Sequence, residues 1–211
     1  MIQTIEVHAQ RATGTLGRDY IDPKVLAVMD AVPRHEFVAA SRQDDAYDDR
    51  PLPIGHGQTI SQPFIVALMT DMLEVGPDDV VLEVGTGSGY QAAVLARLVR
   101  DVHTIEIIPE LAETAEERLA RLGYDNVRTY TGDGYYGAPE VAPFDAIVVT
   151  AAAQQVPPPL IQQLKPGGRM VIPVGGGFAL QHLMLVEREE DGRVRTRQTL
   201  PVRFVPLTRG F

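Results

Sequence analysis

The chain has 211 residues, of which 45% are hydrophobic and 22% are charged, a composition typical of one globular domain with a buried core. Its 28 Asp and Glu residues exceed its 19 Lys and Arg residues, so the formal net charge is −9. An acidic chain without a basic run is a poor partner for nucleic acid. Because cysteine is absent, disulfides, thiolate nucleophiles and thiolate metal sites are excluded.

The first twenty residues predict no regular element, since Gly14 and Gly17 interrupt them and no hydrophobic period persists. They are polar and mixed in charge, which is unlike a secretory signal. No stretch of the sequence is apolar over the length that a membrane span requires. We therefore expect a cytoplasmic protein that does not bind membranes.

Residues 22–32 are predicted to form a helix with one apolar face. Asp22 is placed to cap this helix, and Pro23 falls at its first position. Residues 42–58 are polar and rich in proline and glycine, which predicts a loop. A second helical pattern covers residues 62–73.

The sequence TISQP, residues 59–63, joins this loop to the second helix. It carries two hydroxyls and an amide, and the hydrophobic pattern gives it no packing role. In the simplest interpretation, Thr59 or Ser61 is an N-cap whose oxygen accepts free backbone N–H groups, while Gln62 and Pro63 turn the chain into the helix. A second role depends on what the following segment binds.

From residue 79 onward, short apolar strands alternate with amphipathic helices, which predicts a doubly wound parallel sheet. The predicted strands are 79–84, 102–107, 126–132, 144–152 and 167–175, and the predicted helices are 88–99, 109–123 and 157–164. Two further apolar runs, 179–189 and 197–207, flank an Asp-Gly turn and predict an antiparallel hairpin. We therefore expect an α/β fold with a mostly parallel, Rossmann-like sheet and helices on both faces. We expect an antiparallel C-terminal strand pair to close the edge of this sheet, and a small N-terminal helical segment to precede the sheet in the chain.

A glycine turn follows the first predicted strand of this sheet. Gly85, Gly87 and Gly89 let a ligand lie against the backbone at the start of the next helix, with Thr86 and Ser88 between them. A dinucleotide fingerprint, G-x-G-x-x-G, needs a further glycine at position 90, where this chain has tyrosine. The spacing instead suits a cofactor with an amino-acid and a nucleoside part and no pyrophosphate.

Carboxylates stand at the ends of three predicted strands. Glu106 follows Gly85 by 21 residues, where it can accept both ribose hydroxyls of an adenosine. Asp133, followed by Gly134, is placed to accept the exocyclic amine of an adenine, and Glu83 is expected near the ammonium of a methionine moiety. Each residue also has a simpler interpretation. Glu106 could be an exposed acid at a strand end, Asp133 could be part of a Gly-Asp-Gly surface turn, and Glu83 could be paired with a nearby cation. Because strand ends converge on one crevice, the set together predicts an S-adenosyl-L-methionine site.

Several motifs taken together resemble one known family. They are VPRHEFV, AYDDRPLPI, LPIGHGQTISQP, VLEVGTGSGYQAA, GDGYYG, PFDAIVVTAAA, LKPGGRMVIPVG and VRFVPL. The chain between about Ile21 and Leu207 resembles the protein-L-isoaspartate O-methyltransferases, a class I S-adenosylmethionine-dependent family. The resemblance implies methylation of the free α-carboxylate of L-isoaspartyl residues in damaged peptides and proteins, which starts repair through a succinimide.

The resemblance also assigns roles within TISQP. Ser61 matches the active-site serine of the family, whose hydroxyl touches the isoaspartyl carboxylate, and Thr59 and Ile60 line the same pocket. A carboxylate with a pKa of about 3.5 to 4 is already the nucleophile at neutral pH, so no general base is required. His56 is a further candidate for contact with substrate or cofactor. The remaining histidines are scattered and predict no metal site.

Two alternatives and the division of the chain remain open. The chain could methylate another carboxylate or a small-molecule acceptor, or it could be a non-catalytic subunit that binds the cofactor. We expect residues 1–78 to form a helical and loop segment that carries TISQP, and residues 79–211 to form the methyltransferase core. The sequence leaves the oligomeric state open.

Overall fold

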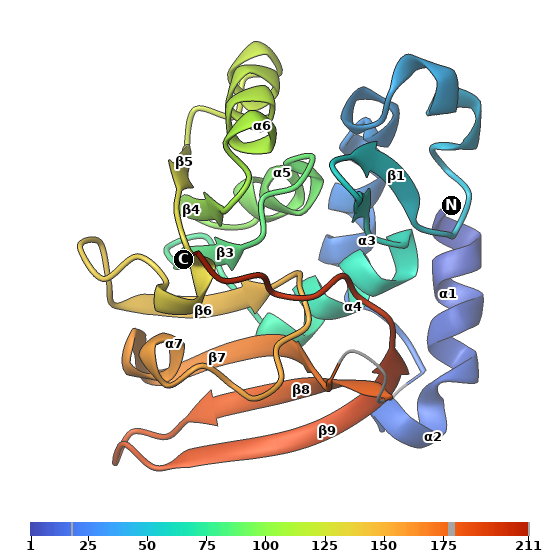
Figure 1. Cartoon of the computed structure of the whole chain (residues 1–211). Helices are drawn as coiled ribbons and strands as arrows, with labels where there is room; N and C mark the ends of the chain where they lie inside the picture. The colour runs from blue at the N-terminus through green and yellow to red at the C-terminus, as the bar shows by residue number, and fades with distance from the viewer. Residues whose placement is uncertain (18, 177–179, 211) are drawn as a thin grey trace.

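A seven-stranded sheet runs through the centre of the computed structural model, which describes residues 1–17, 19–176 and 180–210 (Figure 1). The strand order is β5-β4-β3-β6-β7-β8-β9. Strands β3 to β7 are parallel, whereas β8 and β9 run antiparallel. The bounds are β3 Val80–Val84, β4 Asp101–Glu106, β5 Val127–Thr131, β6 Phe144–Val149, β7 Leu164–Val174, β8 Gln181–Arg188 and β9 Val194–Val202. The predicted fold class is confirmed.

Helices cover both faces of this sheet, as predicted. Successive side chains of a strand point to opposite faces, so Val81 and Leu82 enter different hydrophobic clusters. Val81 packs in the cluster that contains α4 and α5, and Leu82 packs in the one that contains Leu160 of α7. The bounds are α4 Pro63–Leu73, α5 Tyr90–Ala96, α6 Pro109–Arg121, which packs beside β4 and β5, and α7 Pro158–Gln162.

The N-terminal residues are more regular than the sequence predicts. Helix α1 spans Ile2–Arg11 and contacts α4, and a short α2 follows at Thr13–Leu16. The expectation of no regular element over the first twenty residues is therefore wrong. Ile5 and Ala9 lie one helical turn apart and are both fully buried. An apolar face of two residues is too short to give a recognisable helical period in a polar sequence.

Helix α3, Pro23–Ala31, begins as the sequence predicts. The Asp22 side chain accepts a hydrogen bond from the Lys24 backbone N–H at 2.8 Å, and Pro23 occupies the first turn. Three 3₁₀ segments complete the helical elements of the described residues: η1 Arg34–Phe37, η2 Ala40–Asp45 and η3 Gly134–Tyr136.

The predicted loop at 42–58 contains regular structure. Besides part of η2, it includes β1 at Leu52–Gly55, which pairs antiparallel with β2 at Gln58–Ile60. Residues 55–57 have positive φ, and two of the three are glycine, which permits the tight turn. Thr59 and Ile60 consequently lie in a strand rather than in a loop, which corrects the prediction for this stretch.

The predicted C-terminal hairpin is confirmed, with Gly192 in the left-handed region at its turn. Ala179, the first residue of its predicted first strand, lies outside the described residues. The second strand ends at Val202, and the chain then leaves the sheet and crosses the end of β6 (Figure 1). There Ala152 donates to the Val205 carbonyl and accepts from the Leu207 N–H, both at 2.8 Å. Residues 203–210, here termed the C-terminal tail, therefore lie over the carboxyl ends of the parallel strands.

One hydrophobic cluster extends from Ile5 in α1 to Leu185 in β8. The N-terminal helices and the sheet thus bury apolar surface against each other. The expected division of roles, with TISQP carried by residues 1–78 and the methyltransferase core formed by residues 79–211, stays a prediction. Among the helices of the described residues, none is long and apolar enough to cross a membrane.

Candidate active site

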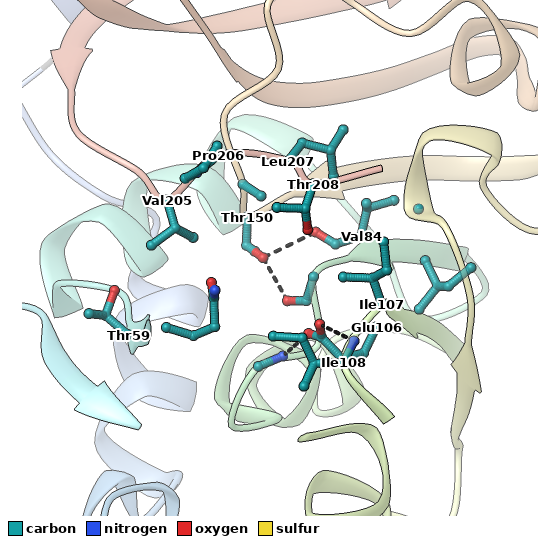
Figure 2. Close-up of a pocket in the computed structure, with 16 residues that line it drawn as sticks. Thr59, Val84, Glu106, Ile107, Ile108, Thr150, Val205, Pro206, Leu207 and Thr208 are labelled. Carbon is teal, nitrogen blue, oxygen red and sulfur yellow. Dashed lines mark hydrogen bonds between the residues drawn. The ribbon is translucent and has the colours of Figure 1, made fainter. Parts of the chain in front are cut away.

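The glycine turn after β3 brings the backbone close to the end of β6. Gly85, Gly87 and Gly89 have φ of 97°, 54° and 86°, in the left-handed region. A Cβ atom added to Gly85 would lie 2.4 Å from Thr150 Oγ1, and that hydroxyl donates to the Gly85 carbonyl at 2.6 Å (Figure 2). Both the backbone angle and the approach of Thr150 exclude a side chain at Gly85.

Glu106 ends β4 with its carboxylate against this turn. Oε2 accepts from the Gly87 N–H at 2.9 Å, and Oε1 accepts from the Ile108 N–H at 3.1 Å (Figure 2). A carboxylate has about four acceptor positions, so two are left for a ligand. Glu106 therefore fixes the turn and still offers acceptors to a pair of hydroxyls.

Asp133 accepts hydrogen bonds within the chain that the sequence does not predict. Its Oδ1 accepts from the Tyr135 N–H at 3.0 Å, which caps η3. Its Oδ2 accepts from Arg209 Nε at 3.2 Å and from the Gly210 N–H at 3.1 Å, both in the C-terminal tail. The acceptor expected for an adenine amine is thus already bound by the tail.

Gly134, next to Asp133, lies against β3. A Cβ atom there would be 2.4 Å from Val84 Cγ1, so only glycine fits without movement of the strand. Gly134 and Val84 line the same cavity.

Glu83 is fully buried in β3 and belongs to a hydroxyl network. Thr104 Oγ1 donates to Glu83 Oε2 at 2.5 Å, and Thr104 Oγ1 lies 2.6 Å from Thr86 Oγ1. Burial raises the pKa of Glu83 to about 8, the negative charge of Glu106 adds to this, and the Thr104 hydrogen bond opposes it. At neutral pH Glu83 is therefore largely protonated, which differs from the carboxylate that the sequence predicts beside an ammonium group.

Two cavities meet between the glycine turn and the C-terminal tail. The inner cavity is lined by Gln58, Thr59, Val84, Gly85, Gly87, Ile105, Glu106, Ile107, Ile108, Gly134, Thr150, Ala151 and residues 205–208. Figure 2 shows Val205 to Thr208 on one side of it and Glu106 with Ile108 on the other. The outer cavity, which is the larger of the two, is lined by Pro51, Thr59, Ser61, Gln62, Ile65, Thr150, Leu180 and residues 201–205. Thr59, Thr150 and Val205 line both, so the two cavities form one continuous cleft.

TISQP forms the wall between the cavities. Gln62, not Thr59 or Ser61, is the N-cap residue of α4, and its side chain makes no capping bond, so the N-cap interpretation is wrong. The N–H of Phe64 is instead accepted by Asp49 Oδ1 at 2.8 Å. Within the described residues the Ser61 hydroxyl makes no hydrogen bond, and Ser61 faces both the outer cavity and a narrow space beside Thr86 and Ser88. A free hydroxyl at this point can donate to a ligand.

The comparisons with known proteins identify the family. The family model for protein-L-isoaspartate(D-aspartate) O-methyltransferase (PCMT) matches residues 13–211. The chain belongs to this family. It is 66% identical over 210 residues to protein-L-isoaspartate O-methyltransferase 2 of Syntrophobacter fumaroxidans, covering 100% of this chain and 85% of the relative. It is 65% identical to protein-L-isoaspartate O-methyltransferase 1 of Cupriavidus necator, covering 98% of this chain and 80% of the relative.

Solved structures of the same family agree with the fold. A protein-L-isoaspartate O-methyltransferase matches with a TM-score of 0.83 at 30% identity, covering 98% of this chain and 65% of that longer chain. The β-aspartate methyltransferase (PCMT) of Plasmodium falciparum, solved in complex with S-adenosyl-L-homocysteine, matches with a TM-score of 0.80 at 25% identity, covering 99% and 98%. The family and the fold predicted from the sequence are thereby confirmed.

Some candidates lie away from the cleft, and some of its residues were not predicted. His56 is exposed at the β1–β2 turn and lines neither cavity. Arg203, which lies within the VRFVPL motif, lines the outer cavity. Thr208 and Arg209 were missed, because the sequence of the C-terminal tail has no period that predicts its path. Within the part of the chain that the structure describes, no group of three His, Cys, Asp or Glu residues is arranged to hold a metal ion.

Proposed function

We propose that this methyltransferase uses S-adenosyl-L-methionine to methylate the free α-carboxylate of L-isoaspartyl residues in damaged peptides and proteins. Membership of the family supports the reaction. The observation that carries the assignment of the site is the unbonded Ser61 hydroxyl, which stands where the outer cavity meets the space beside the glycine turn.

The lining of the inner cavity fits the chemistry of the cofactor. Glu106 offers acceptors for the ribose hydroxyls, and Val84, Ile105 and Ile108 supply apolar surface for a purine ring. At Gly85 and Gly134 a side chain would fill the space against Thr150 and Val84, so both glycines keep the cavity open.

The cofactor set that we propose is the one expected from the sequence: Glu83, Gly85, Thr86, Gly87, Ser88, Gly89, Glu106, Asp133 and Gly134. Glu83 and Thr86 contribute through their shared contact with Thr104, which fixes the turn. Gly89 also favours glycine, since its φ is 86° and a Cβ atom there would lie 3.2 Å from Leu119 Cδ1, a tight contact. Asp133 Oδ2 can accept the adenine amine only if it does so alongside the hydrogen bonds from the C-terminal tail or after the tail has released it.

The acceptor enters through the outer cavity. Thr59 and Ser61 line it, and Ile60 lines the narrow space beside the glycine turn. We assign substrate contact to these three residues and catalysis to Ser61. Its hydroxyl donates to one carboxylate oxygen and leaves the other oxygen free to attack, without neutralising the anion. Holding the two reacting atoms at about 3 to 3.5 Å converts the transfer into an effectively intramolecular step.

Bound S-adenosyl-L-methionine supplies an electrophilic methyl group on a positively charged sulfur. The chain itself needs no base, because the acceptor is ionised at neutral pH. Val205 and Leu207 of the C-terminal tail cover the cleft and keep water from the reacting atoms. After release, a backbone nitrogen attacks the methyl ester, methanol leaves and a succinimide forms. Hydrolysis of that ring restores some normal aspartate.

The alternative acceptor class is tested by competition. Labelled methyl transfer to an isoaspartyl peptide is measured with and without an excess of small dicarboxylic acids. If the acids do not change the rate of methyl transfer to the peptide, the acceptor is a peptide, as the open outer cavity implies. Preferred methylation of a small acid would instead support the alternative function.

Partners and compartment follow from this reaction. Isoaspartyl peptides and proteins are the proposed substrates, with no role for nucleic acid or membranes. We propose the cytoplasm as the compartment, since the cofactor is a metabolite of the cytoplasm.

A further inference from the structure

Arg34 is a buried cation directly behind TISQP. It lies in η1, and none of its surface is exposed. Its Nε donates to the Ala46 carbonyl and its Nη2 donates to the Ser61 carbonyl, both at 2.8 Å. The guanidinium carbon also lies 4.8 Å from the ring centre of Tyr90, the first residue of α5 after the glycine turn. Arg34 therefore touches the substrate segment and the cofactor helix at once.

The segment after β2 is held from a second side by Asp49. Its Oδ1 accepts from the Phe64 N–H and its Oδ2 accepts from Gln62 Nε2, each at 2.8 Å. His8 of α1 lies 2.5 Å from Asp49 Oδ2. The backbone at Ser61 and Gln62 is thus fixed between Arg34 and Asp49, while the Ser61 hydroxyl is left free.

The charge of Arg34 is compensated only in part. The carboxylate of Asp49 and the Tyr90 side chain both favour the charged guanidinium. Its hydrogen bonds to the backbone go to two neutral carbonyls, and its Nη1 has no hydrogen-bond partner within the described residues. Burial of an uncompensated charge is unfavourable, and an anion nearby reduces that cost. The anion that the reaction brings to Ser61 is the acceptor carboxylate.

We propose that Arg34 is a positioning residue for methyl transfer, which orients Ser61 through its carbonyl and lends positive potential to the site of the acceptor carboxylate. This inference rests on the proposed function. Arg34 acts through Ser61 and does not touch the substrate. A residue that only supported the fold would affect cofactor binding and acceptor binding together, whereas a positioning residue affects the acceptor alone.

The test compares Arg34→Met, which removes the donors and the charge, with Arg34→Lys, which keeps the charge. The control is Arg188→Met, because Arg188 Nη1 donates to the Leu164 carbonyl at 2.5 Å at the opposite end of the sheet. For each variant, kcat and KM are measured with an isoaspartyl peptide, and the Kd of S-adenosyl-L-homocysteine is measured by calorimetry. If Arg34→Met does not fold, Arg34→Gln replaces it, since it also removes the charge.

For the neutral variant we expect KM to rise about tenfold or more, and the Kd of S-adenosyl-L-homocysteine to change less than about threefold. The KM of Arg34→Lys should lie between those of the neutral variant and the unmodified protein, and the KM of Arg188→Met should equal that of the unmodified protein. An unchanged KM in the neutral variant, or an equal loss of cofactor affinity, would overturn the proposal. Failure of the unmodified protein to methylate the peptide would instead reject the proposed function, before any variant is compared.

Discussion

Replacing Glu83 by glutamine should change how stability depends on pH. The unfolded carboxyl group has a pKa of 4.5, and burial raises the pKa of Glu83 to about 8 in the folded chain. Between these values the unfolded state loses its proton and the folded state keeps it, so the free energy of unfolding falls as pH rises. The loss is about 1.4 kcal/mol per pH unit, or on the order of 3 kcal/mol between about pH 5 and about pH 7.5.

Glu83→Gln lacks this titration, while its amide can still accept from Thr104. The free energy of unfolding of the variant minus that of the unmodified protein should therefore increase with pH by that amount. Urea unfolding followed by circular dichroism at a series of pH values measures both curves, and other titrating groups cancel in the difference. Glu113→Gln, on the exposed face of α6, controls for loss of a charge. A difference that stays constant with pH would refute a buried, protonated Glu83.

Four further substitutions test the two sides of the cleft. Ser61→Ala should lower turnover while the Kd of S-adenosyl-L-homocysteine stays within a few-fold; calorimetry that shows affinity lost in proportion to activity would place Ser61 on the cofactor side. Glu106→Ala and Asp133→Ala should each weaken cofactor binding by roughly 1 to 3 kcal/mol, and an unchanged Kd would remove that residue from the site. Arg209→Ala removes one of the two donors to Asp133 Oδ2 and leaves the Gly210 N–H, so it should tighten binding a few-fold, and weaker binding would mean that the C-terminal tail helps to hold the cofactor.

The sheet could be predicted from sequence because its information is local. Short, nearly continuous apolar runs such as 144–149 are typical of buried parallel strands, and the glycines at 85, 87 and 89 mark a turn by type and spacing. The hairpin at β8 and β9 has its own turn residue, Gly192. Each of these features is contained in fewer than about twenty residues.

What the sequence did not predict depends on contacts between distant residues. The helix at Ile2–Arg11 buries only a short stripe, and its burial depends on packing against α4. The pKa of Glu83 is raised because a closed core buries it, and Thr104, whose hydrogen bond opposes that rise, lies 21 residues further on. Arg209 reaches Asp133 across 76 positions of the chain, which no periodicity indicates.

The central claim is tested most directly with two copies of one short peptide that differ only in isoaspartate or normal aspartate at one position. Methyl transfer from labelled S-adenosyl-L-methionine is measured for both under the same conditions. The account predicts transfer to the isoaspartyl peptide alone. Equal transfer to both peptides, or transfer to neither with cofactor binding intact, would contradict it.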